Sequence, residues 1–422
     1  MHKKIQIPYD RTHIEIDLPE KNIAYLGTVR DQKQIAPVTW QHDAPLHEMA
    51  GDKKVLILLA DATRDIPFHT IIDHLFLSLG KAPRTVTLCL ATGTHDGEND
   101  ENYAILAHAK NRADNYGIPL TATLIHNCHT NQCVNAGKTS FGNEILVNKV
   151  VREHDFILIH ADMKHHYFAG YSNPIKYIIP GICAFQTIER NHALALDPHS
   201  TFGHHPLHPD VSRRSNPVSQ DMWEGFQLVT KNIPVYVVLT ISAARNIIWQ
   251  QSGLLTDVIA QGMRAVDEKM GIKLTPTDHL IVNCGGYPND ESFYTAQRAL
   301  ELTKNAVRDD GEILFIAGCC NGIGPAKSIE NFYTPLKDNI PVLLNQYART
   351  YKMYTHKVYK FAQLIDRINN LYIYSMLPDE KISAIHSQPV KNIQDVINCW
   401  LAKEKNCKIN IILDGNKIAV YA

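Results

Sequence analysis

Short apolar runs alternate with amphipathic stretches along most of the chain, beginning with KVLILLA at 54–60 and TVTLCLA at 85–91. Each run has the length of a buried strand, and each precedes a polar loop and then apolar residues at helical spacing. Strand-loop-helix repeats of this kind predict an α/β fold. The same reasoning predicts further strands at 121–125, 156–159, 234–241, 279–282 and 312–317, and helices up to 79 and over 100–116, 184–196, 254–270 and 291–307.

The pattern weakens in two places. Residues 197–232 turn polar, with four prolines and fading apolar periodicity, which predicts a linker or an excursion over the surface. Beyond 324, strands near Val342, Leu371 and Ile409, with helices between them, continue the α/β pattern. At 422 residues the chain is long enough for two domains. We expect an N-terminal domain over 1–270, of which 245–270 lies between the domains, and a C-terminal domain over 271–422.

Composition narrows the classes of function. Lys plus Arg number 42 against 43 for Asp plus Glu, so no basic surplus predicts a nucleic-acid partner. The first residues alternate like a strand and contain no apolar signal region, and no window is apolar enough for a membrane span. The nine cysteines are scattered and odd in number. We expect reduced thiols and a cytoplasmic protein without a membrane partner.

Two polar loops follow neighbouring predicted strands. The first is Asp61-Ala62-Thr63-Arg64 and the second ends in Gly93-Thr94-His95. If the two strands are parallel neighbours, both loops lie at one sheet edge, where α/β proteins bind ligands. Arg64 offers a fork suited to a carboxylate or phosphate. The alternative is that Asp61 and Thr63 only cap the following helix.

The segment 164–196 concentrates further candidate chemistry. His166, Lys176 and His192 lie in an apolar frame punctuated by Pro180-Gly181. A lysine in such a frame tends to have a lowered pKa, which favours the nucleophilic amine. The alternative is a lysine that extends its head group to water, with histidines that serve only the core.

Two clusters suggest zinc by composition alone. His126, Cys128, His129 and Cys133 form the first, and the run 204–208, HHPLH, forms the second. Neither has the spacing of a closed structural zinc site. A zinc hydrolase built on the first cluster is nevertheless an alternative that metal analysis would test.

Four motifs in order resemble the nickel-pincer-nucleotide lactate racemase family. They are DATRDIP from 61, LATGTH from 90, the 164–196 segment with HYFAGYS, a lysine, PGI and RNH, and GGYPNDESFYTAQRAL from 285. The resemblance covers most of the chain, from the first motif to the Gly-rich turn at 318–324. It implies two α/β domains with a catalytic cleft between them, and an isomerase that inverts a 2-hydroxy acid through a 2-keto acid.

The resemblance also assigns roles to individual residues. It implies that His95 and His166 are the catalytic bases, one for each enantiomer, and that Lys176 carries the covalently tethered cofactor, pyridinium-3,5-bisthiocarboxylic acid mononucleotide nickel. The implied metal ligand is His192. Cofactor contacts are expected from Asp61, Thr63 and Arg64, and substrate contacts from Arg64, Tyr294, Thr295 and Arg298. Separate maturation enzymes for carboxylation, sulfur insertion and nickel insertion are implied partners.

Three departures from the family pattern bear on the substrate and the tether. Asn173-Pro174-Ile175 precedes the lysine where the family usually has two glycines and one more residue, which stiffens the approach to Lys176. Thr295 and Arg298 stand where lactate racemases carry Gln and Lys. We therefore expect a 2-hydroxy acid other than lactate, bulkier or more polar. The alternatives are a sugar-acid (aldonate) C2 epimerase with the same cofactor, and a nucleotide-binding homologue without turnover.

Overall fold

A computed structural model describes residues 1–28, 44–64, 66–243 and 246–421. The chain divides into two compact units, and the polypeptide leaves one of them and returns to it. The central unit comprises Gln34–Val266, and the split unit comprises Met1–Lys33 together with Asp267–Ala422. This division differs from the predicted 1–270 and 271–422 at the N-terminus, because the first 33 residues group with the C-terminal part of the chain.

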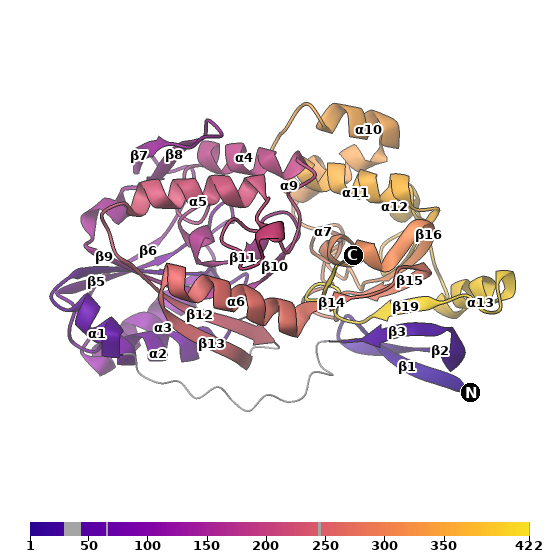
Figure 1. Ribbon diagram of the computed structural model, residues 1–422, viewed down its shortest axis with the longest axis horizontal. Helices are drawn as coiled ribbons and strands as arrows, with labels where there is room; N and C mark the ends of the chain where they lie inside the picture. Colours follow the sequence, from indigo (N-terminus) through magenta and orange to yellow (C-terminus); the bar gives the residue numbers. More distant parts are fainter. Residues whose placement is uncertain (29–43, 65, 244–245, 422) are drawn as a thin grey trace. The chain divides into compact units, whose positions relative to one another are not determined.

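The central unit is built on a six-stranded sheet in the order β13-β12-β9-β4-β5-β6 (Figure 1). All neighbouring pairs are parallel except β12 with β13. The strands are β4 (Lys54–Leu59), β5 (Thr85–Leu90), β6 (Leu120–Ile125), β9 (Phe156–Asp162), β12 (Val235–Ala243) and β13 (Asn246–Leu254). The five runs predicted as strands in this part of the chain are therefore confirmed, although their apolar sequences alone could not order them.

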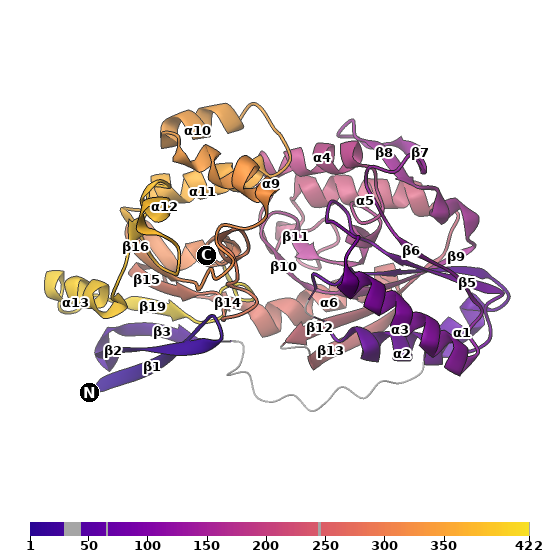
Figure 2. The ribbon, with the colours of Figure 1, turned by 180° about the vertical axis from the view of Figure 1, so that it is seen from behind.

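Helices cover both faces of this sheet, as Figures 1 and 2 show from opposite sides. On one face, alternate residues such as Val55, Ile57 and Leu59 pack with α1 (Ala44–Ala50), α2 (Phe68–Leu79) and α3 (Asp100–Tyr116) in a single apolar core. On the other face, α6 (Leu255–Met270) packs closely, since a Cβ on its Gly262 would touch Leu239 of β12. The unbroken burial of β4 from Val55 to Leu59 thus follows from a sheet covered on both sides.

Smaller elements of the central unit carry or support the candidate residues. Two short hairpins are β7 (Cys133–Lys138) with β8 (Glu144–Asn148) and β10 (Lys164–His166) with β11 (Gly170–Ser172). The others are η3 (Lys149–Glu153), η4 (Pro174–Tyr177), α4 (Phe185–Ala193), η5 (Leu194–Leu196), η6 (Val211–Arg213) and α5 (Pro217–Thr230).

The region predicted as a linker contains a helix of fourteen residues, α5, so that prediction was wrong. Val218, Met222, Phe226 and Val229 are buried at helical spacing. Polar residues between them, and the prolines before the helix, masked this periodicity in the sequence. Pro217 itself occupies the first turn, where its missing N–H costs nothing.

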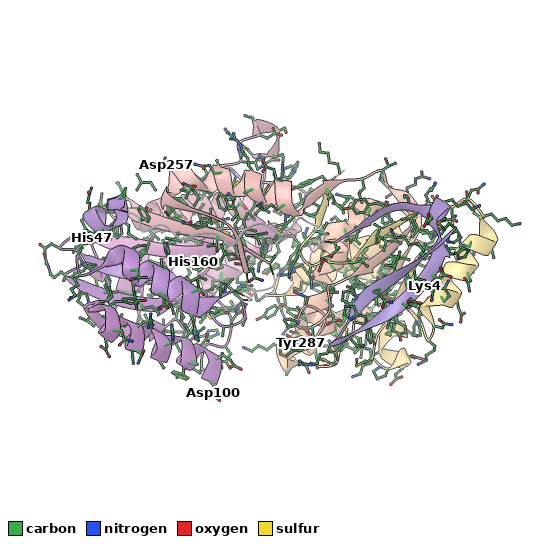
Figure 3. The ribbon with its side chains drawn as sticks, turned by 90° about the horizontal axis from the view of Figure 1, so that it is seen from below. Lys4, His47, Asp100, His160, Asp257 and Tyr287 are labelled. Atoms are coloured by element: carbon green, nitrogen blue, oxygen red, sulfur yellow. The ribbon has the colours of Figure 1, made fainter. Side chains whose placement is uncertain are left out.

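The split unit contains a second six-stranded sheet, entirely parallel, in the order β18-β17-β16-β15-β19-β3. Its edge strand β3 (Ile23–Gly27) comes from the N-terminus and pairs with β19 (Ile409–Ile412). The hairpin of β1 (His2–Tyr9) and β2 (Thr12–Pro19) contributes buried isoleucines to the same core. This pairing explains why the N-terminal segment groups with the C-terminal part. Lys4 marks β1 in Figure 3, where Asp100 marks the start of α3 and His160 the central sheet.

The remaining elements of the split unit connect its strands. They are η1 (Glu20–Asn22), β14 (Gly271–Lys273), β15 (Thr277–Asn283), α7 (Phe293–Ala296), α8 (Arg298–Thr303), η7 (Lys304–Ala306), β16 (Val307–Ile316), α9 (Ala326–Ser328), η8 (Ile329–Tyr333), η9 (Pro335–Lys337), α10 (Ile340–Tyr347), α11 (Thr355–Arg367), β17 (Asn370–Tyr374), α12 (Asp379–Ser383), β18 (Gln388–Pro389), α13 (Ile393–Lys403) and β20 (Ala419–Tyr421). The helix predicted over 291–307 is broken between α7 and α8, and Val342 lies in a helix instead of the predicted strand.

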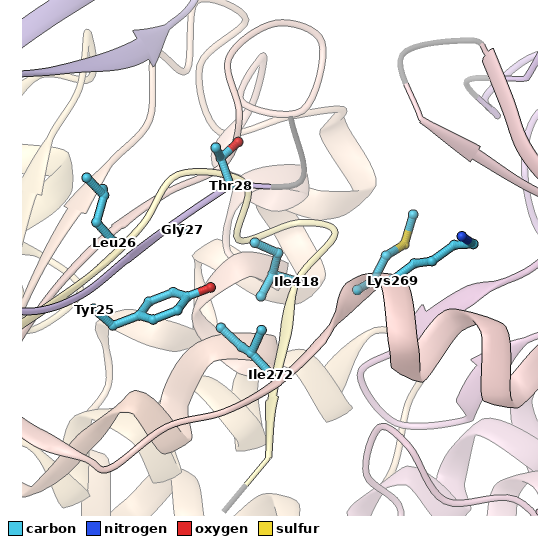
Figure 4. A pocket seen from close by; sticks show the side chains of 8 residues that line it. Tyr25, Leu26, Gly27, Thr28, Lys269, Ile272 and Ile418 are labelled. Carbon is cyan, nitrogen blue, oxygen red and sulfur yellow. The ribbon is translucent and has the colours of Figure 1, made fainter. Parts of the chain in front are cut away.

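A cavity of about 230 Å³ lies in the split unit beside β3 and the end of α6 (Figure 4). Its lining includes Tyr25, Thr28, Lys269 and Ile418, and none of the predicted site residues. No helix in the described parts of the chain combines the length and apolar character needed to cross a bilayer. All nine cysteines are free thiols.

Candidate functional site

The predicted loops of the central unit leave neighbouring strands at the same edge of the sheet. Strand β4 lies between β5 and β9, and all three run parallel. The DATR loop therefore follows β4, the Gly-Thr-His turn follows β5, and the hairpin with His166 follows β9. Because the three loops lie at one edge of the sheet, the predicted pairing of parallel neighbours is confirmed.

Asp61 and His95 form a hydrogen bond between two of these loops. Nδ1 of His95 lies 2.7 Å from a carboxylate oxygen of Asp61, which is only 2% exposed. The other carboxylate oxygen accepts hydrogen bonds from the backbone N–H and the hydroxyl of Thr63. Asp61 does not cap α2, whose N-cap is Pro67 without a side-chain hydrogen bond. It fixes His95 instead, with Nδ1 toward the carboxylate and Nε2 directed away.

Arg64 adds positive charge beside this pair. Burial alone would raise the pKa of Asp61, but the hydrogen bond and charge of His95, followed by the charge of Arg64 and the hydroxyl of Thr63, lower it to about 2. The Arg64 side chain is exposed. The same guanidinium also lowers the pKa of Lys176, which places the DATR loop electrostatically next to the lysine segment.

Phe168 is the contact shared by the three candidate groups of the 164–196 segment. Its ring centroid lies 4.5 Å from that of His166 and 5.2 Å from that of His192, edge-on to both. Nζ of Lys176 lies 5.8 Å from the same ring centroid. One buried aromatic side chain therefore gathers a proposed base, the proposed tether and the proposed metal ligand.

Lys176 lies on a short 3₁₀ helix whose start is set by the residues before it. The side chain of Asn173 accepts the N–H of Ile175 at 2.9 Å and so caps η4, with Pro174 in the first turn. The departure noted in the sequence therefore builds a rigid helix start in place of a flexible glycine approach. Burial, with the charges of Arg64 and Lys164, lowers the pKa of Lys176 to about 7.

His192 lies near the end of α4, the helix predicted over 184–196. Burial, together with the charge of Lys176, lowers the pKa of His192 to about 3. The imidazole is therefore neutral at physiological pH, the form that binds a metal. His192 and Lys176 are close enough for the charge of one to shift the pKa of the other. A neutral imidazole nitrogen can bind a metal, and an amine that loses its proton can form a covalent bond, so the pair fits a tethered metal cofactor.

The loop between β10 and β11 is held by the start of α5. Nδ2 of Asn216 donates to the carbonyl oxygens of Phe168 at 3.0 Å and Thr201 at 2.9 Å. The hydroxyl of Ser219 donates to the carbonyl oxygen of Ala169 at 2.7 Å. These buried bonds fix the backbone on which Phe168 and His166 stand.

The histidine-rich run 204–208 supports the same hairpin from another side. Gly170 has a φ of +70°, and a Cβ there would overlap the carbonyl oxygen of His204, so glycine is required. Arg213 donates to the hydroxyl of Tyr171 at 2.6 Å and to the carbonyl oxygen of Gly203 at 2.7 Å. The run thus has a structural role next to the candidate site.

Of the predicted substrate residues, Arg64 lies in the central unit and the other three lie in the split unit. Tyr294 and Thr295 are in α7, and Arg298 begins α8. Ser292 caps α7, and its hydroxyl donates to the hydroxyl of Thr295 at 3.1 Å. Burial raises the pKa of Tyr294. Their approach to the cluster of the central unit, and hence the catalytic cleft, stays a prediction from the sequence.

The zinc alternative lacks a ligand set. Among the described residues, which include both candidate clusters, no three His, Cys, Asp or Glu side chains are grouped to hold a metal ion. The two ring nitrogens of His126 make hydrogen bonds with the carbonyl of Cys183 at 2.9 Å and the amide of Asn148 at 3.2 Å. His126 is thus a core residue.

Phe168 and Asn216 belong to the site but were not predicted from the sequence. Phe168 lies inside the HYFAGYS motif, but it bears no titratable or metal-binding group, so its side chain alone does not indicate a functional residue. Asn216 lies 24 positions beyond His192 in the region predicted as a linker. An Asn-Pro pair before apolar residues at helical spacing is a capping signal that could have identified it.

The fold and the cluster together define a two-unit α/β protein with a buried lysine-histidine site at the edge of one parallel sheet. The chain belongs to the lactate racemase family. The family models described as Lactate racemase N-terminal domain and Lactate racemase C-terminal domain match residues 9–203 and 272–420.

Individual relatives agree with this assignment. The chain is 24% identical to the lactate racemase of Thermoanaerobacterium thermosaccharolyticum and 24% identical to that of Lactiplantibacillus plantarum, over 99% of this chain and of each relative. The solved lactate racemase apoprotein from T. thermosaccharolyticum has the same fold, with a TM-score of 0.82, 20% identity and complete coverage of both chains. A Thermotoga maritima structure matches with a TM-score of 0.60 and 14% identity, over 89% of this chain and 96% of its own.

Proposed function

We propose that the protein is a racemase or epimerase of a 2-hydroxy acid that uses a nickel pincer nucleotide attached to Lys176. Membership of the lactate racemase family supports a racemase acting on lactate-like acids. The observation that carries the finer proposal is the convergence of Lys176 and His192 on Phe168. A binding module without turnover has no need of these groups together with two further histidines.

Lys176 and His192 are the residues that would hold the cofactor. The lowered pKa of Lys176, about 7, leaves a substantial fraction of its amine neutral and nucleophilic near neutral pH. The neutral imidazole of His192 would ligate nickel. When bound, the cofactor supplies a hydride acceptor, so that the substrate passes through a planar 2-keto acid. Asp61, Thr63 and Arg64 would support it from the neighbouring loop.

His95 and His166 are held differently, which suits two opposite proton transfers. His95 directs Nδ1 to the Asp61 carboxylate, so its neutral ring carries the proton there and leaves Nε2 as a base. Nδ1 of His166 instead accepts the backbone N–H of Ala169 at 3.2 Å, so its neutral ring carries the proton on Nε2. His95 is therefore ready to accept the hydroxyl proton at Nε2, and His166 would return a proton from its doubly protonated form, because a neutral imidazole is too weak an acid to give up its Nε2 proton.

Intact-mass and nickel analysis test the proposal on protein produced together with the maturation enzymes. We expect one covalent adduct and one nickel ion in the wild type. Lys176→Ala should lose the adduct, and His192→Ala should lose nickel while an adduct persists. Lys164→Ala is the matched control, because it removes a nearby lysine and should keep both.

The loaded protein would then be screened with 2-hydroxy acids and aldonic acids for exchange of stereochemistry at C2. Wild-type protein without adduct or nickel, beside a lactate racemase that acquires both under the same conditions, would refute the tether.

A further inference from the structure

Lys357 is a buried lysine in the first turns of α11, outside the residues assigned from the sequence. Lys357 is only 9% exposed. The ammonium donates to the backbone carbonyl oxygen of Tyr294 at 3.0 Å, and Nζ lies 3.4 Å from the centroid of the Tyr294 ring. Lysines usually extend their charge into water. A lysine held over an aromatic ring in the interior is therefore unusual and indicates a role beyond packing.

Arg298 brings a second positive charge to the same place. Burial lowers the pKa of Lys357 well below its ordinary value, and the charge of Arg298 lowers it further. A charged Lys357 beside Arg298 is unfavourable in this buried setting unless an anion offsets the two positive charges. Lys357 covers the ring of Tyr294, and Arg298 follows Tyr294 by four residues in the sequence.

The surroundings of this pair favour an anion as well. Helix α11 has no acidic residue in its first turn, whereas His356 and Lys357 lie there and Lys360 follows, all buried. Basic residues at the positive end of a helix dipole are unfavourable, and a bound anion there is favourable. The Tyr294 ring is itself fixed by edge contacts with Phe332 at 5.6 Å and Tyr354 at 6.2 Å.

We propose that Lys357 and Arg298 form a subsite for a second anionic group of the substrate. The inference rests on the proposed function and names its substrate class, a 2-hydroxy acid that carries an additional carboxylate or a phosphate. A monocarboxylate needs one of these cations at most. The short side chain of Thr295, one turn from Arg298, leaves room for the longer molecule.

Calorimetric titration of the loaded, full-length protein tests the subsite. The probes are lactate with one carboxylate, malate with two, and 2-hydroxy-3-phosphopropanoate with a phosphate. We expect wild-type protein to bind at least one dianion about tenfold or more tighter than lactate. Lys357→Met should weaken that dianion about tenfold and lactate less than twofold, because a charge-assisted hydrogen bond is lost only with the second anionic group. Lys357→Arg should retain most of the preference.

The control is Lys352→Met, which removes an exposed lysine just before the same helix and should change neither affinity. Thermal unfolding of each variant shows that Lys357→Met remains folded, which its similar length favours. An unchanged ratio of dianion to lactate affinity in Lys357→Met would overturn the subsite. Loss of nickel and adduct from Lys357→Met, with the ratio unchanged, would also overturn it by assigning the cations to the cofactor phosphate.

The same samples separate this inference from the function on which it rests. If no 2-hydroxy acid is racemised but dianion binding still depends on Lys357, the proposed function fails and the anion subsite stands. If lactate and malate are racemised equally well by the wild type and by Lys357→Met, the function stands and the subsite fails.

Discussion

Single residues in this protein take their character from their neighbours. Asp61 would be an ordinary loop carboxylate if it were isolated, but it is 2% exposed and hydrogen-bonded to both Thr63 and His95. Lys176 would be a surface lysine in a more polar frame, but burial and two nearby cations lower its pKa to about 7. In both cases the chemical property belongs to the contact between loops that are distant in the sequence.

Asp61→Asn should weaken both catalysis and stability at neutral pH. An amide cannot hold a protonated His95, so we expect a decrease of at least tenfold in turnover, larger for the enantiomer deprotonated by His95. The pKa of Asp61 falls from 3.8 to about 2 on folding, so its contribution of about 2 kcal/mol is complete above pH 4 and is lost as the pH falls toward 2.

Urea unfolding of the wild type and Asp61→Asn between pH 2 and 7 measures this contribution. Their stabilities should differ at neutral pH and converge toward pH 2. Asp52→Asn is the control, because it removes an exposed carboxylate paired with Arg84 outside the site. A difference between wild type and Asp61→Asn that stays constant over the whole range would contradict the depressed pKa.

At the scale of elements, α5 acts as the support of the β10–β11 hairpin. Its first residues hold the backbone of Phe168 and Ala169, and its apolar face packs in the interior. The histidine-rich run and Arg213 complete the support. The position of His166 therefore depends on a helix fifty residues further along the chain.

Asn216→Ala should loosen this support. The variant loses the cap of α5 and two buried hydrogen bonds to backbone carbonyls, so we expect a loss of about 2–4 kcal/mol in unfolding free energy. Hydrogen exchange should accelerate at the amides of 166–171. Asn99→Ala removes the cap of α3 without touching the hairpin and should cost about 1 kcal/mol. Equal exchange at 166–171 in both variants would show that the cap alone matters.

At the scale of the whole molecule, the chain builds one mostly parallel sheet from the middle of its sequence and a fully parallel one from its two ends. Strand β3 joins the edge of β19, and the β1–β2 hairpin shares a core with α13. The N-terminal segment is thus structural for the split unit, which carries Tyr294, Thr295, Arg298 and Lys357.

Ile7→Ala should destabilise the split unit and spare the central one. Ile7 is fully buried in the core shared with Ile411 and Trp400, so truncation should cost about 2–4 kcal/mol. Hydrogen exchange should quicken at 409–412 and remain unchanged at 54–59 in the central sheet. Lys4→Ala, on the exposed side of the same strand, is the control. Faster exchange at 54–59 would show that the two units unfold together.

The sequence by itself determined the class of fold, the strands around the site and the identity of the chemical groups. A short apolar run such as 54–60 predicts a strand that is buried on both faces. The motifs around His95, His166, Lys176 and His192 are short and contiguous, so they can be recognised without knowing the fold. Only the tertiary structure decided which neighbours those groups have. Phe168 as the shared contact, Asn216 as the support, β3 as a strand of the other unit and Lys357 beside Arg298 all arise from pairings between distant residues. Such pairings depend on strand order and burial, which local periodicity does not encode.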